Sequence, residues 1–174
     1  MDLVTMGFLA TLALFIFPLG MALSAASDLL TMTIPNKLVL ALLAGYFLVA
    51  LPVGVPLEEI GFSLLVAMAV LLVGFVFFAR GWIGGGDAKL AAVTTLWLGL
   101  HLTVPYLVYA AFGGGILTLA ILALRRMPLI PLISRFRWLE RLHDRNSGVP
   151  YGIALAMSGL LTYSSSTIFE RLTA

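Results

Sequence analysis

Long apolar runs divided by short polar segments set the pattern of this chain, and runs of this length predict membrane-spanning helices. A helix needs about 20 largely apolar residues to cross the hydrocarbon core of a bilayer. The first runs lie at about 3–27, 38–55 and 60–79. A longer uncharged run covers 90–124, and as one helix at about 1.5 Å per residue it would be about 52 Å long. Because the hydrocarbon core is only about 30 Å thick, this run must fold back once.

The fold-back most naturally lies in "LGLHLTVP", which contains Gly99, His101 and Pro105. A final apolar run follows near the carboxyl end of the chain. We therefore predict an all-α, polytopic membrane protein with one domain over residues 1–174 and six transmembrane helices, the last three at about 88–102, 105–124 and 150–168. A cleaved signal peptide would have a basic start, whereas this chain begins with Asp2 and no Lys or Arg, so we expect the first helix to be retained.

The composition agrees with a membrane protein and excludes several kinds of site. Hydrophobic residues make up 61% of the chain and charged residues only 10%, against about 25% charged in a soluble domain. The chain has no cysteine, which excludes a disulfide framework, a thiol nucleophile and a cysteine zinc site. The two histidines, His101 and His143, stand in no metal-binding motif. We expect no metal, no cofactor and no nucleic-acid partner.

The distribution of basic residues predicts the orientation of the helices. If the spans alternate, only Arg171 lies on one side, and nine of the ten basic residues lie on the other. Basic residues concentrate on the cytosolic side of membrane proteins. We therefore expect both termini to face outward and the loops 28–37, 80–89 and 125–149 to face the cytosol. The nine are Lys37, Arg80, Lys89, Arg125, Arg126, Arg135, Arg137, Arg141 and Arg145.

The basic loop 125–149 contains an amphipathic pattern, "LISRFRWLERLHDR". Ile133, Phe136, Leu139 and Leu142 fall near one helical face, and the arginines fall elsewhere. This pattern favours a short basic helix that lies on anionic lipid between the fifth and sixth spans. An irregular loop that serves only to orient the chain is the alternative.

Two acidic residues, Asp28 and Asp87, stand at the predicted cytosolic boundary of the membrane, where ionisable groups are costly and indicate function. Asp87 could instead cap the helix that follows it, and Asp28 could be a solvated boundary residue. Neither alternative explains the three glycines of 84–86, which allow unusual backbone angles and the close approach of another chain. The other acidic residues lie in outward segments or in the basic loop: Asp2, Glu58, Glu59, Glu170, Glu140 and Asp144.

Two neighbouring carboxylates have a defined chemistry. Like charges a few ångströms apart cannot both ionise easily, so the pair holds one proton between them. The ionised group can act as general base on a water molecule, and the protonated group can polarise a peptide carbonyl. Asp28 and Asp87, if they meet, therefore indicate an aspartyl protease.

Three segments of the sequence together resemble the type IV prepilin peptidases. "DLLTMTIPNKL" (28–38) resembles the first aspartate motif of that family, and "GGGDAKLAA" (84–92) resembles its G-x-G-D motif. "VPYGIALAMSG" (149–159) resembles the opening of its last helix. The small size is similar to the short peptidases of tight-adherence (Flp) pilus systems. Longer relatives carry an insert with paired cysteines and an N-methyltransferase activity; because this chain has no cysteine, the resemblance implies peptidase activity alone.

The resemblance implies roles for the matching residues. Asp28 and Asp87 would be the catalytic pair. The motif glycines would let the substrate backbone pass beside Asp87, and Lys89 would have a positional or an electrostatic role. Pro35 would fix the turn that starts the second span. The glycine run is Gly84, Gly85 and Gly86, and Asn36 belongs to the same turn as Pro35. Pro150, Tyr151 and Gly152 would pack near the site.

The resemblance also implies the substrate and the location. The substrates would be prepilins or pseudopilins, which have a short basic leader followed by an apolar helix. Cleavage would occur at the cytosolic boundary of the bacterial inner membrane, with lipid as the other partner. One rival is a small proton- or cation-coupled transporter with Asp28 and Asp87 as ion sites, which would favour carboxylates near the midplane and inverted repeats. The other is a non-catalytic assembly protein of a secretion apparatus.

Overall fold

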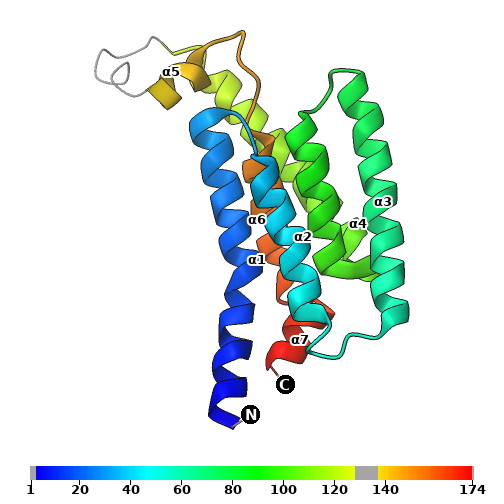
Figure 1. Cartoon of the computed structure of the whole chain (residues 1–174). Helices are drawn as coiled ribbons and strands as arrows, with labels where there is room; N and C mark the ends of the chain where they lie inside the picture. The colour runs from blue at the N-terminus through cyan, green and yellow to red at the C-terminus, as the bar shows by residue number, and fades with distance from the viewer. Residues whose placement is uncertain (1–2, 128–136, 174) are drawn as a thin grey trace.

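The protein is a bundle of α-helices in the computed structural model, which describes residues 3–127 and 137–173 (Figure 1). This part of the chain forms seven helices and no strand, so the prediction of an all-α fold is confirmed. The helices are α1 (Leu3–Thr31), α2 (Asn36–Ala50), α3 (Leu57–Ala79), α4 (Gly85–Leu124), α5 (Arg137–His143), α6 (Tyr151–Tyr163) and α7 (Thr167–Thr173).

Proline sets the start of three helices. Pro35, Pro56 and Pro150 stand directly before α2, α3 and α6, with φ angles of −63°, −57° and −74°. Proline has no N–H to leave unpaired at a helix start, and its ring holds φ near the helical value. The prediction that Pro35 begins the second helix is confirmed.

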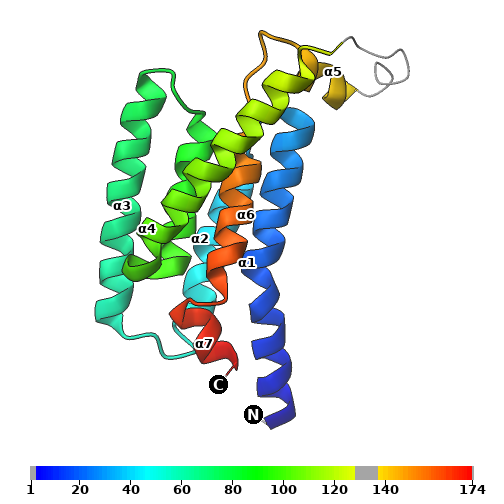
Figure 2. The ribbon, with the colours of Figure 1, turned by 180° about the vertical axis from the view of Figure 1, so that it is seen from behind.

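Helix α4 is broken at Gly99, where φ is 76° and ψ is 178°. The first part of α4, residues 85–98, and the second part, residues 100–124, run in opposite directions (Figures 1 and 2). The predicted fold-back is therefore confirmed, and it lies within the predicted segment "LGLHLTVP", at Gly99; the first part of α4 ends at about 98 rather than at the predicted 102. Glycine reaches this positive φ without a clash between Cβ and the backbone, whereas Pro105 lies inside the second part of α4 and removes only one donor.

The helices are those of a membrane protein. Among the helices of the described residues, three are long and apolar enough to span a bilayer: Ala13–Thr31 within α1, α3, and α4. A fourth span results if α6 and α7, which meet at a bend of 49°, cross together. Helix α2 is apolar but has only 15 residues. Six crossings would result only if α4 crosses twice, because it is doubled back on itself, and if the short α2 also crosses. The six predicted crossings therefore stay a prediction.

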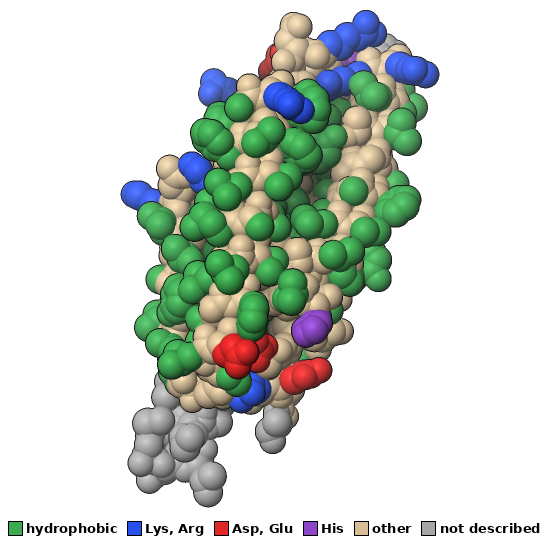
Figure 3. Space-filling model, turned by 90° about the vertical axis from the view of Figure 1, so that its right-hand side faces the viewer, with side chains coloured by type: hydrophobic (Ala, Val, Ile, Leu, Met, Phe, Trp, Pro, Cys, Tyr) green, Lys and Arg blue, Asp and Glu red, His purple; other side chains and the backbone are tan. Residues whose placement is uncertain are grey.

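The first part of α4 forms the centre of the molecule, and the outer surface is apolar. Trp97 in this part is 1% exposed, contacts the rings of Phe17 and Tyr46, and donates a 2.9 Å hydrogen bond to the Leu42 carbonyl. Figure 3 shows hydrophobic side chains over the middle of one face, with most of the basic side chains toward one end. An apolar belt between polar ends suits a protein surrounded by lipid.

The connections alternate between the two ends of the bundle. The α1–α2 and α3–α4 loops and the segment around α5 lie at one end, which we call the loop end, and both termini lie toward the other (Figure 1). Which end faces the cytosol stays a prediction. Helix α5 occupies part of the predicted amphipathic segment; Ile133, Arg135 and Phe136 lie outside the described residues, as does Asp2.

Candidate active site

Asp28 lies in the last turn of α1 and is held by the start of α6. Its side chain is only 5% exposed, and its Oδ2 atom accepts a 2.7 Å hydrogen bond from the N–H of Gly152. A Cβ atom on Gly152 would lie 2.8 Å from the same oxygen, so only glycine lets the carboxylate approach this closely. The free N–H groups of a first helical turn favour a nearby negative charge, so the start of α6 stabilises the ionised form of Asp28.

Asp87 is the third residue of α4, and its carboxylate folds back over the start of the helix. The Oδ2 atom accepts a 3.1 Å hydrogen bond from the N–H of Gly84, which is the capping residue. The alternative that Asp87 itself is the N-cap is therefore wrong, although its bond to Gly84 is the kind that a third helical residue makes in a capping box. The side chain is half-buried, which leaves it more accessible than that of Asp28.

The two aspartates come together at the loop end of the bundle. The charge of Asp28 acts on Asp87, so the two carboxylates lie within electrostatic range of each other. Ile34, from the α1–α2 loop, packs against the starts of α4 and α6. A Cβ on Gly86 would lie 3.1 Å from this side chain, and one on Gly152 would lie 2.9 Å from it. The glycines therefore allow the starts of α4 and α6 to close around the end of α1.

The other motif residues position these segments. Lys89 donates a 2.9 Å hydrogen bond from Nζ to Oδ1 of Asn36 and so joins α4 to the start of α2. This contact ties the two motif segments to each other. Gly85 packs under Phe78 of α3, where a Cβ would lie 3.3 Å from the ring. The segment thus links three helices around Asp87.

Tyr151 and Pro150 anchor the start of α6 against α4. Pro150 is buried, and the Tyr151 hydroxyl shares a 3.0 Å hydrogen bond with the hydroxyl of Thr118. The Tyr151 ring packs on Gly114, where a Cβ would lie 2.7 Å from it. Gly114, the middle residue of the run "GGG" at 113–115, therefore lets the start of α6 pack closely on α4.

Arg125 holds the segment that leads into α6, and this contribution was not predicted. It is 8% exposed. Its guanidinium donates hydrogen bonds of 2.8, 2.9 and 2.9 Å to the carbonyls of Leu142, Ser147 and Gly148. In the sequence Arg125 is one of several basic residues after an apolar run, so nothing there distinguishes it from a residue that only orients the chain.

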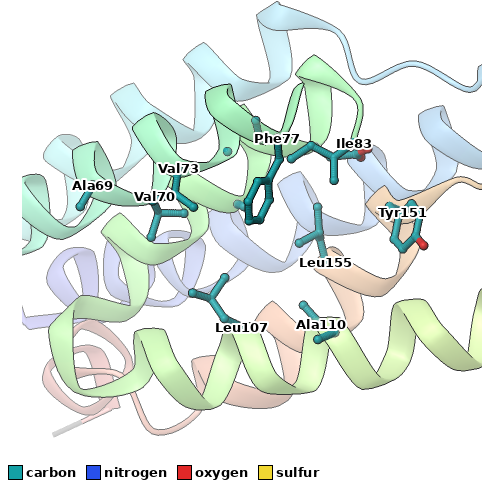
Figure 4. Close-up of a pocket in the computed structure, with 14 residues that line it drawn as sticks. Ala69, Val70, Val73, Phe77, Ile83, Leu107, Ala110, Tyr151 and Leu155 are labelled. Carbon is teal, nitrogen blue, oxygen red and sulfur yellow. The ribbon is translucent and has the colours of Figure 1, made fainter. Parts of the chain in front are cut away.

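A cavity of about 480 Å³ lies beside Asp87, between α3, both parts of α4 and α6 (Figure 4). Asp87 is its one charged lining residue, and nearly all of the rest are apolar. A second, more polar cavity of about 530 Å³, lined by Glu58, Glu59 and His101 among others, adjoins the α4 break. Within residues 3–127 and 137–173, no cluster of three or more His, Asp or Glu side chains is placed to hold a metal ion.

Together, the fold and this site define a helical membrane protein with two acidic side chains within electrostatic range of each other at one end of the bundle. The type IV leader peptidase family matches residues 15–119, and the chain belongs to this family. It is therefore an aspartic-type prepilin peptidase, a hydrolase, as the sequence motifs predict. The matched residues include both Asp28 and Asp87. Comparison with curated proteins and with solved structures gives no significant match.

Proposed function

We propose that Asp28 and Asp87 are the catalytic pair with which this peptidase removes the leader of a prepilin. The observation that carries the proposal is their placement: the two carboxylates, both within the matched region, stand at the loop end within electrostatic range of each other, and each accepts a backbone N–H. Two carboxylates that were only solvated surface groups would not need these hydrogen bonds from backbone N–H groups. Fixed, neighbouring carboxylates are what an aspartyl protease requires.

In the proposed mechanism, the pair holds one proton between its two carboxyl groups. The ionised carboxylate takes a proton from a water molecule as the oxygen attacks the carbonyl carbon of the scissile peptide bond. The protonated carboxyl gives its proton to the carbonyl oxygen, which becomes a hydroxyl in the tetrahedral intermediate. When the C–N bond breaks, the carboxyl that took the water proton passes it to the leaving amine, which becomes the new N-terminus, and a hydroxyl of the intermediate returns its proton to the other carboxylate. The pair ends the cycle with one proton again.

The surroundings of the two groups suggest different tasks. The Gly152 N–H and the start of α6 stabilise the charge of the buried Asp28. Asp87 is more accessible and lines the apolar cavity of about 480 Å³, so it is the group that a substrate reaches first. These contacts fix both carboxylates before substrate binds, which lowers the reorganisation that the reaction requires.

We further propose that cleavage occurs at the cytosolic face of the bacterial inner membrane, on substrates with a basic leader and an apolar helix. The basic residues after α3 and α4 support this orientation, because Arg80 and Arg125 follow these helices at the same end as both aspartates. Six crossings with both termini outside would result. The pilus system served would be of the tight-adherence type.

A transporter that uses the same aspartates as ion sites is the rival function. Asp28 stands in the last turn of α1 and Asp87 in the first turn of α4, so both lie at helix ends rather than midway along a span. Transporter sites typically lie near the bilayer midplane. This position and the family membership favour the peptidase.

Cleavage by single variants tests the catalytic pair. Asp28→Asn and Asp87→Asn keep the size of each side chain but remove its acid–base function, so each should lower kcat by about a thousand-fold or more. Glu58→Gln at the far end and Asp144→Asn at the loop end are matched controls that should cleave normally. The substrate is a basic leader joined to an apolar helix, in detergent or in membranes. Normal cleavage by either aspartate variant would reject the proposed pair.

A further inference from the structure

We propose that the cavity beside Asp87 binds the apolar side chain that directly follows the cut bond of the substrate. This inference rests on the proposed function of Asp87 and assigns the substrate contact of the same site. The cavity is large enough for a leucine-sized or larger side chain at about 480 Å³, and its walls carry almost no polar surface. A pocket of this kind selects for apolar groups, because it offers a polar group no partner.

The cavity begins at the reacting group itself. Asp87 lines it, and Ala88 and Ala91, one and four residues further along α4, continue the wall. The facing walls come from α3, the second part of α4 and α6. Small side chains on the walls, such as Ala69 and Ala111, keep the space open. A peptide bond held at Asp87 would therefore place a neighbouring side chain directly in this cavity.

The direction of the cavity decides which side of the cut bond it receives. Ile83 and Tyr151 lie toward one end of it, and Ala69 and Val70 lie toward the other (Figure 4). Ile83 precedes α4 and Tyr151 begins α6, so this end is the loop end, whereas Ala69 and Val70 lie midway along α3. The cavity thus extends from the site toward the middle of the apolar belt. The leader is polar and stays at the loop end, so the residue that enters the cavity is the one after the cut.

The rim of the cavity shows how a membrane-embedded substrate would reach it. Val73 and Phe77 on α3 and Leu107 on the second part of α4 line the cavity, yet their side chains are 55%, 38% and 36% exposed. The opening therefore lies on the apolar outer surface, between α3 and the second part of α4. A substrate helix can approach from the lipid and present its first residues sideways, without leaving the bilayer.

Filling the cavity from its exposed wall residues tests the inference. Ala69→Leu on α3 and Ala111→Leu on α4 narrow the space from two sides, and both alanines are exposed, so the folded protein tolerates the larger side chain. Ala120→Leu is the matched control, since Ala120 is exposed on the same helix and outside the cavity lining. Two substrates are compared, each a basic leader followed by an apolar helix. They differ only in the residue after the cut, leucine or alanine, with the cut assigned by mass spectrometry of the wild-type products.

The expected result is a change in selectivity. Wild type should cut the leucine substrate with a kcat/KM about 10-fold above that for the alanine substrate, and both filling variants should abolish this preference while still cutting the alanine substrate. Ala120→Leu should keep it. An unchanged preference in both filling variants, as expected if lipid occupies the cavity, overturns the inference, as does a parallel loss on both substrates. If wild type cuts neither substrate, the proposed function fails first, and the inference falls with it.

Discussion

At the scale of single residues, the site depends on how closely backbone and carboxylate approach each other. Gly152 places its N–H 2.7 Å from Asp28, and it can do so only because it has no side chain. This pairing shows why the sequence predicts the two aspartates but not the hydrogen bonds that hold them in place. A carboxylate at a membrane boundary is visible as an anomaly in the pattern, whereas a hydrogen bond between residues 124 positions apart exists only in the folded chain.

The contact predicts the effect of adding one methyl group. In Gly152→Ala the new Cβ meets the Asp28 carboxylate at 2.8 Å, so the carboxylate must move. A displacement of about 1 Å can lower turnover by about 100-fold, and we expect a loss of kcat of that order. Gly61→Ala, where nothing lies within 4 Å of the added Cβ, is the control for cleavage and thermal unfolding. Full activity in Gly152→Ala would mean that this hydrogen bond does not position Asp28 for catalysis.

Arg125 is the second residue whose role comes from the structure alone. In Arg125→Met the three carbonyls of Leu142, Ser147 and Gly148 lose their donor, and we expect about 3 kcal/mol of destabilisation. Thermal unfolding in detergent measures it, and turnover should fall because the segment carries the start of α6. Arg126→Met, at the exposed neighbour, should change stability by less than about 0.5 kcal/mol. Equal effects of the two variants would contradict a special role for Arg125.

At the scale of elements, hydrophobic run length predicts the helices well and their ends less well. The doubling of the uncharged run 90–124 follows from bilayer thickness alone. Its place does not, because Gly99 and Pro105 both disfavour a regular helix and only packing decides between them. Similarly, Pro35 predicts the start of α2, whereas Asp87 lies three residues beyond the N-cap position of α4, which is Gly84. The cavity is beyond prediction, since it arises from three helices that meet in space.

The break in α4 predicts a cost for any side chain at Gly99. The space near its Cβ position is ordinary, with the nearest atom 3.6 Å away, so the effect comes from the backbone angles alone. Gly99→Ala should destabilise the protein by about 1–3 kcal/mol, the range for such angles in residues other than glycine. Gly115→Ala, in the helical second part of α4 with nothing within 4 Å, should have no such effect on the thermal midpoint. A neutral Gly99→Ala would show that the break can form with other angles.

At the scale of the whole molecule, the proposed orientation can be read from labelling, because the chain has no cysteine of its own. We expect Glu58→Cys, in the first turn of α3, to react with a membrane-impermeant maleimide from outside the cell. Arg126→Cys, after α4, should react only once the cytosolic side is opened. The unmodified chain gives the background. The opposite labelling pattern would place the aspartates outside and contradict cleavage at the cytosolic boundary.

The hydrogen bond from Gly152 to Asp28 has a consequence for biosynthesis. The family match ends at residue 119. The donor to Asp28, the N–H of Gly152, lies 124 residues after Asp28 and so beyond the matched region. A ribosome-bound chain that has not yet released α6 therefore holds both acids but lacks the amide that fixes one of them. Proteolytic competence would then appear only after the start of α6 has left the ribosome and packed against α1.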